Sequence, residues 1–152
     1  HLSSVAHFNP EVFGPMASKA FLERLPHDSD LLASIKEVFD KNNIRMGFFV
    51  AIGAVKNAKM AFYVQEDHKY REFSFDEPAE ILNCTGNVSE VDGDTFVHAH
   101  ITLGLRDGTT RGGHLVEGTR IFACELFMLP LDGEQLKRTF DDVTGLKLWN
   151  DK

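Results

Sequence analysis

Apolar and polar residues alternate between positions 96 and 105, which is the clearest hydrophobic pattern in the chain. β-branched and aromatic residues dominate this segment and no proline interrupts it, so the pattern predicts a β-strand. The other face of the strand would carry His98 and His100, which therefore point into polar surroundings. The core face would carry Val97, Ala99, Ile101, Leu103 and Leu105.

A tight hairpin is predicted directly after this strand. Residues 106–108, Arg-Asp-Gly, fit a three-residue loop in which the glycine takes the left-handed position. In that register His100 lies opposite His114 and on the same face as His98. A two-residue turn at Asp107-Gly108 would instead send His114 to the other face, although a bulge at Gly112-Gly113 could restore it.

The three histidines of this hairpin, His98, His100 and His114, are candidate metal ligands. Buried imidazoles need partners at both ring nitrogens, and neighbouring protonated rings repel each other, so a divalent cation resolves both problems. Three nitrogen ligands that leave a fourth position open are typical of zinc sites that carry out chemistry. We therefore expect a divalent metal, with zinc favoured, although imidazole also suits nickel, iron and copper. The alternative is that the histidines serve packing or hydrogen bonding.

The rest of the chain predicts one clear helix and a series of strands. Asp28 and Asp30 are capping residues before an amphipathic stripe that runs from Leu31 to Phe39. Residues 44–52 are almost continuously apolar, as expected of a strand covered on both faces, and Gly53 would end it. Further strands are expected at residues 17–25, 59–65, 70–75, 79–88 and 120–129. The order predicts an α+β fold with a mixed, largely antiparallel sheet of about seven strands and a few flanking helices.

Length and composition fit one domain. The chain has 152 residues, of which 43% are hydrophobic, so we expect a single domain over residues 16–150. Residues 1–15 would be an irregular leader or a remnant of an expression vector. Without a long apolar run or a recognisable signal sequence, we expect a cytoplasmic protein that does not enter membranes and keeps Cys84 and Cys124 reduced.

The net charge of −7 argues against nonspecific binding to nucleic acid, because such binding starts from clustered positive charge.

Glu125 is a second candidate for chemistry, because it is the one acid in an apolar strand. A buried carboxylate needs a partner, since burying it ionised and alone would cost several kcal/mol. It would either form an edge or interface salt bridge, or lie beside the histidines as a proton acceptor. Glu117 is a weaker candidate for the same catalytic role.

Several short motifs resemble the plant and prokaryote conserved domain, also called the PPC or DUF296 family. The resemblance covers roughly residues 17 to 149 in the expected order. The motifs are Asp30-Leu31-Leu32, Ile52-Gly53-Ala54-Val55, residues 80–87, His98-Ala99-His100, Asp107-Gly108, Gly112-Gly113-His114-Leu115 and Glu125. His-x-His followed by Gly-Gly-His-Leu is the most specific of them.

The resemblance implies a PPC-like fold, assembly as a homotrimer, and metal binding by His98, His100 and His114. Plant relatives are described as DNA-binding, but their AT-hook lies outside this domain and this chain has none, so a DNA-binding label would be inherited by analogy. We therefore expect a zinc-binding homotrimer of unassigned biochemical role, whose partners beyond itself would be other proteins. The alternative is a hydrolase-like enzyme that activates a water at a three-histidine metal and acts on a small molecule.

Overall fold

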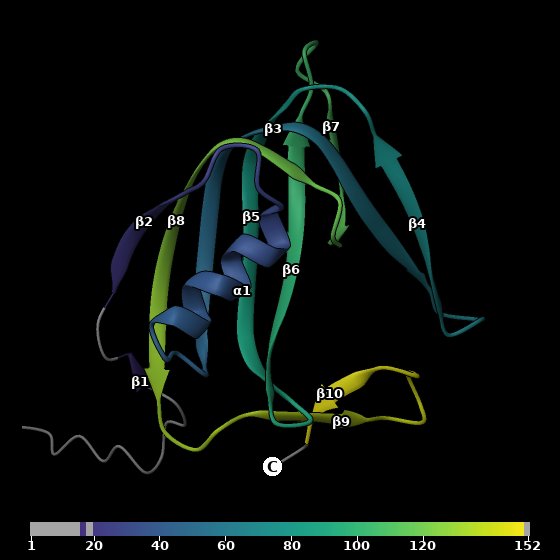
Figure 1. Cartoon of the computed structure of the whole chain (residues 1–152). Coiled ribbons are helices and arrows are strands. Elements are labelled where there is room, and N and C mark those ends of the chain that lie inside the picture. The colour runs from purple at the N-terminus through teal and green to yellow at the C-terminus, as the bar shows by residue number, and fades with distance from the viewer. Residues whose placement is uncertain (1–15, 18–19, 151–152) are drawn as a thin grey trace, which may run out of the picture.

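The described part of the chain forms a strongly bent sheet with a single helix across one face (Figure 1). The computed structural model describes residues 16–17 and 20–150. Over these residues the sheet contains ten strands, and the helix is α1 (Leu31–Lys41). The strands are β1 (Met16–Ala17), β2 (Phe21–Leu25), β3 (Gly47–Val64), β4 (Lys69–Phe75), β5 (Ala79–Val91), β6 (Asp94–Gly104), β7 (Thr110–Leu115), β8 (Arg120–Asp132), β9 (Lys137–Phe140) and β10 (Lys147–Trp149).

Strand β3 organises the sheet. Its first half pairs with β5 and β8, and its second half pairs with β4 and β7. Strands β5, β6 and β7 form a meander that starts and ends on β3, so the sheet curls back on itself. Every ladder is antiparallel except the short β5–β9 pair, which confirms the mixed, largely antiparallel sheet.

Three details differ from the sequence prediction. The described residues contain one helix rather than a few, and ten strands rather than about seven. The strands expected at 44–52 and 59–65 are one continuous strand, β3, and Gly53 lies within it. Gly53 lies at a register shift in the β3–β5 ladder, and on its other side a Cβ would lie 2.1 Å from the carbonyl oxygen of Ala123 on β8. The glycine therefore permits close strand packing and a bulge instead of ending the strand.

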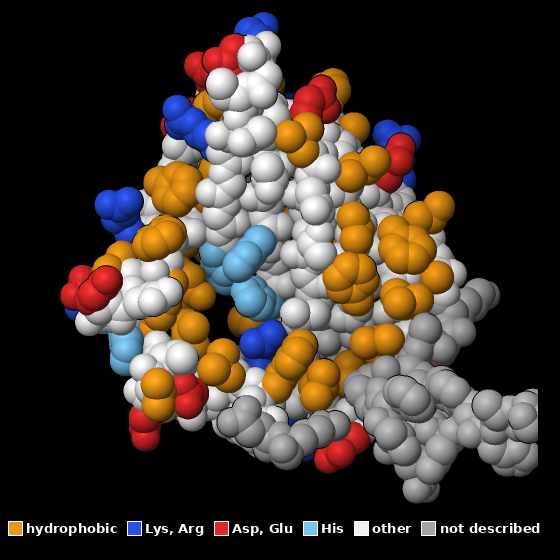
Figure 2. Space-filling view, turned by 180° about the vertical axis from the view of Figure 1, so that it is seen from behind, with side chains coloured by type: hydrophobic (Ala, Val, Ile, Leu, Met, Phe, Trp, Pro, Cys, Tyr) orange, Lys and Arg blue, Asp and Glu red, His pale blue; other side chains and the backbone are white. Residues whose placement is uncertain are grey.

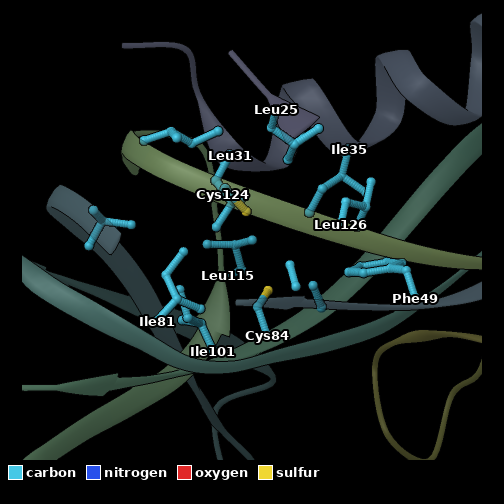
Figure 3. Packing of buried hydrophobic residues seen from close by; sticks show 14 of the residues in the cluster. Leu25, Leu31, Ile35, Phe49, Ile81, Cys84, Ile101, Leu115, Cys124 and Leu126 are labelled. Atoms are coloured by element: carbon cyan, nitrogen blue, oxygen red, sulfur yellow. The ribbon is translucent and has the colours of Figure 1, made fainter. Parts of the chain in front are cut away.

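The helix packs its apolar stripe onto the inner face of the sheet. Asp30 caps it, because its carboxylate accepts a hydrogen bond from the backbone N–H of Ala33 at 2.9 Å. Leu31 and Ile35 are fully buried against the sheet, as Figure 3 shows. Facing them are Phe49, Cys84, Ile101, Leu115, Cys124 and Leu126.

The two cysteines belong to this core. Cys84 and Cys124 are buried free thiols, as expected of reduced cysteines. Burial raises the pKa of Cys84 to about 12 and that of Cys124 to about 11, so neither is a reactive thiolate at neutral pH.

The outer face of the sheet is left uncovered by the described residues over β2, β3 and β8. The apolar run in β3 predicted burial on both faces, but Phe48 and Ile52 are exposed while Phe49 and Ala51 are buried. Strand β8 continues the exposed apolar surface with Phe127, which lies opposite Val50 in the ladder.

The expected leader at 1–15 lies outside the described residues. The helix of the described part is too short and too polar to cross a lipid bilayer.

Candidate metal centre

The β6–β7 hairpin has the three-residue loop that the sequence predicted. The backbone N–H of Gly108 donates to the carbonyl of Leu105 at 2.9 Å, and the N–H of Leu105 donates to the carbonyl of Thr109 at 2.8 Å. Gly108 has φ +83°, in the left-handed region that favours glycine. The Asp107 carboxylate accepts hydrogen bonds from the backbone and hydroxyl of Thr109, which fixes the loop.

This turn sets the register that gathers the histidines. His100 lies directly opposite His114 in the β6–β7 ladder. His98 is two residues before His100 on β6, so all three side chains project from the same face. The alternative two-residue turn is wrong for this chain.

The three imidazoles converge closely. Each offers one ring nitrogen such that all three nitrogens lie within 4.8 Å of one another. The Nε2 atoms of His98 and His100 are 3.3 Å apart. The His114 ring centroid is 5.3 Å from that of His98 and 5.6 Å from that of His100.

The surroundings of His98 and His114 favour the neutral form of these two rings. Burial, the Arg138 guanidinium and the two neighbouring imidazoles lower the pKa of His98 to about 4. Burial and His100 also lower the pKa of His114. Neutral imidazole is the form that binds a metal, so at neutral pH His98 and His114 do not have to lose a proton first.

The donor set fits a divalent transition metal. Nitrogen atoms a few ångströms apart can share one ion at ordinary zinc–nitrogen distances of about 2.0–2.1 Å. The cluster found in the described residues contains no thiolate or carboxylate, so it has the three-nitrogen composition of an open site. Figure 2 shows the histidines in a hollow on the sheet face away from α1, with a basic side chain next to them and apolar side chains around the rim.

Two further residues near the cluster were missed by the sequence interpretation. The Tyr70 ring on β4 packs against the His114 ring, with centroids 4.7 Å apart. Arg138 on β9 donates from Nη2 to Asn87 Oδ1 at 3.0 Å, and Asn87 lies directly opposite His98. Neither could be found from local spacing, because both reach the site through strand pairings that are distant in sequence.

The two candidate acids are not brought to the histidines. Glu125 is exposed on β8, opposite Ile52 of β3. Paired residues on neighbouring strands lead from His100 on β6 through β5 and β3 to Phe127 on β8. Three strand spacings, about 14 Å in all, therefore separate His100 from Phe127, which is two residues from Glu125. Glu117 is exposed in the loop after β7 and is also outside the cluster. A carboxylate beside the histidines is therefore not a feature of this chain's described residues.

The match to a family model decides the relationship. The model of the Plants and Prokaryotes Conserved (PCC) domain matches residues 14–132. The chain belongs to the PCC domain family. This is the PPC family expected from the motifs, and the motif set around the histidine hairpin lies within the matched residues.

Solved structures agree with this assignment. The PCC chain resembles a metal-containing protein from Archaeoglobus fulgidus at 43% identity and TM-score 0.86, over 91% of this chain and 98% of that one. It resembles a PPC protein from Pyrococcus horikoshii at 35% identity and TM-score 0.86, over 91% and 95% of the two chains.

A more distant structure shares the fold of the PCC chain. A protein from Bacteroides thetaiotaomicron, named as a candidate DNA-binding protein, matches at 24% identity and TM-score 0.79 over 90% and 96% of the two chains. A search among proteins of curated function finds no match.

Proposed function

We propose that this PCC domain protein binds one divalent metal ion per chain, zinc in the first instance, through His98, His100 and His114. The convergence of three ring nitrogens within 4.8 Å carries the proposal. The lowered pKa values of His98 and His114 support it, because rings that stay neutral are ready to coordinate a cation. The resemblance to a metal-containing archaeal protein points the same way.

Elemental mass spectrometry on untagged protein tests the metal site. We expect near-stoichiometric metal in the wild type and its loss in His98→Ala and His114→Ala. The matched control is His68→Ala, which removes an exposed histidine from the β3–β4 turn and should keep the metal. Equal metal content in all four proteins would contradict the site.

The proposal includes self-association as a homotrimer in the cytoplasm. The number of three chains comes from the family resemblance. The uncovered apolar face of the sheet is the surface that would be buried between chains. Leu22 and Ile52 are 76% and 50% exposed, and they neighbour Phe48, Val50 and Phe127 on the same face of the sheet. A second copy laid against this face would cover the outer side of β3, as its apolar sequence leads us to expect.

A metal-dependent, hydrolase-like enzyme is the second candidate. The observation in its favour is that three nitrogen donors in an open hollow leave room for a further ligand. When bound, zinc would supply Lewis acidity and lower the pKa of a coordinated water. The chain's own residues would hold the ion and orient a substrate. Hydrolysis of small esters or phosphoesters by the wild type, absent in His98→Ala, would favour this candidate, and no turnover by zinc-loaded protein would favour a binding role.

DNA is not among the proposed partners, because a net charge of −7 opposes contact with the polyanionic DNA backbone.

A further inference from the structure

Arg138 is a buried cation without an anionic partner among the described residues. Its side chain lies on β9 and the residue is only 8% exposed. The guanidinium is stacked between two aromatic rings, 5.5 Å from the centroid of Phe96 and 4.8 Å from that of Trp149. Burying a charge without a counterion is costly, so the position calls for an explanation.

The hydrogen bonds of Arg138 leave part of its guanidinium free. Nε donates to Ser89 Oγ at 3.1 Å, Nη1 to the carbonyl of Lys147 at 3.2 Å, and Nη2 to Asn87 Oδ1 at 3.0 Å. A guanidinium has five N–H groups, so one on each Nη is without a partner in the described residues. The three bonds made go to neutral oxygens, which fix the orientation of the group without neutralising it.

The Arg138 guanidinium lies next to the histidine cluster. Asn87, which holds Nη2, lies opposite His98 on the adjacent strand, where facing Cβ atoms are about 5 Å apart. The Arg138 charge acts on both His98 and Tyr70, and the Tyr70 ring packs on His114. The Tyr70 phenol makes no hydrogen bond to the described residues, so its O–H is a further available donor.

The charge balance of the hollow selects an anionic ligand. A divalent ion on three neutral imidazoles, together with Arg138, brings three positive charges. The metal-binding cluster contains no carboxylate, and no ion pair links Arg138 to an acid of the described chain. Planar oxyanions are the ligands that a guanidinium fork and a hard or borderline metal both prefer.

We propose that Arg138 and the three histidines form one site for a small oxyanion, a carboxylate or a phosphate, which binds the metal and accepts the free N–H groups of Arg138. This inference rests on the proposed metal site. Phe96 and Trp149 hold the guanidinium in place, and Tyr70 lies against the ring of His114.

Isothermal titration calorimetry on zinc-loaded protein tests the inference. The probes are glycolate, inorganic phosphate and, as an uncharged comparison, glycolamide. We expect glycolate or phosphate to bind the wild type and glycolamide to bind at least tenfold more weakly. Arg138→Gln should weaken the bound anion at least tenfold, and Arg138→Lys should fall between. The control is Arg111→Gln, which removes a cation from the β6–β7 hairpin that carries the histidines. The Arg111 guanidinium lies 5.2 Å from the centroid of the Phe75 ring, and this variant should bind the anion like the wild type.

The outcomes separate this inference from the proposed metal site. Binding of only one of the two anions, with the same dependence on Arg138, supports the site and identifies the group it takes. Zinc-loaded wild type that ignores both anions, or anion affinity unchanged in the folded Arg138→Lys and Arg138→Gln variants, overturns the inference while leaving the metal site intact. Wild-type protein that holds no zinc overturns both.

Discussion

His100 lies directly opposite His114 across the β6–β7 ladder, and this pairing is set by the length of the loop between them. Deleting Thr109 would keep the three-residue loop but place Thr110 opposite Leu105, which shifts the register by one residue and sends His114 to the other face of the sheet. Loss of a hydrogen-bond partner of a metal ligand typically lowers metal affinity by roughly 10- to 100-fold. Because this variant loses a ligand itself, we expect its zinc affinity to fall by more than that. Zinc competition titrations would measure this.

The control for this deletion is Thr109→Ser, which keeps the chain length and the hydroxyl that donates to Asp107, and it should bind zinc like the wild type. Unchanged affinity in the deletion variant would mean that the register does not gather the ligands.

The metal-free protein should lose stability as the pH falls from 6.5 toward 4. His98 has its pKa lowered from 6.5 to about 4 in the folded state, so in this window the unfolded chain binds a proton that the folded chain does not. The free energy of unfolding therefore falls as the pH drops. Urea unfolding at several pH values should show a shallower dependence for His98→Gln than for the wild type. The control is Thr102→Gln, which places the same side chain at an exposed position of β6 without removing a titratable group and should leave the dependence unaltered.

Parallel curves for all three proteins would contradict the lowered pKa of His98. The aspartates with lowered pKa values do not contribute to this change between pH 6.5 and 4. The stability that they add is lost only as the pH falls below about 3.8. They are Asp28, Asp40, Asp107 and Asp141.

Asp30 should be a stabilising contact between the helix and the site hairpin. One carboxylate oxygen accepts from the N–H of Ala33 at 2.9 Å and the other from the N–H of Gly118 at 2.7 Å, in the loop after β7. Asp30→Ala removes both, and we expect a loss of about 1–2 kcal/mol in the free energy of unfolding. Asp30→Asn, which can still accept at the helix end, should lose less. Equal stability of all three proteins in urea would contradict this role.

The exposed face of the sheet should hold the proposed trimer together. Placing a charge at Ile52 buries that charge in the interface, so Ile52→Asp should shift the protein to a single-chain mass in light scattering. Val143→Asp is the control, because Val143 is 84% exposed and lies in the loop after β9, away from this face. A wild type with single-chain mass would contradict the trimer.

DNA should not bind appreciably. With a charge of −7, the chain offers few contacts to phosphates, and a mobility shift assay at low salt should show no retained fragment. A retained complex that weakens steeply with added salt would contradict this expectation.

The candidate site could be predicted largely from sequence because its information is local. His98, His100 and His114 lie within 17 residues on one hairpin, and strand period plus turn chemistry determine which side chains share a face. The capped helix from Leu31 was predictable for the same reason.

The parts that sequence could not predict depend on long-range packing. Gly53 reads as a strand end, yet it permits the close approach of β8 in the middle of β3. Tyr70 and Arg138 enter the site through the pairing of β4 with β3 and of β9 with β5, and β9 is a short polar strand with no clear alternation. The sequence wrongly suggested that Glu125 is buried, because β8 carries apolar residues on its exposed outer face as well as on its buried inner face.

X-ray absorption spectroscopy of the zinc-loaded, untagged protein tests the central claim most directly. The account predicts imidazole scattering with nitrogen neighbours at about 2.0–2.1 Å, equivalent to three histidines, and no sulfur shell. A shell at about 2.3 Å, the distance of a zinc–thiolate bond, or the absence of imidazole scattering would contradict it.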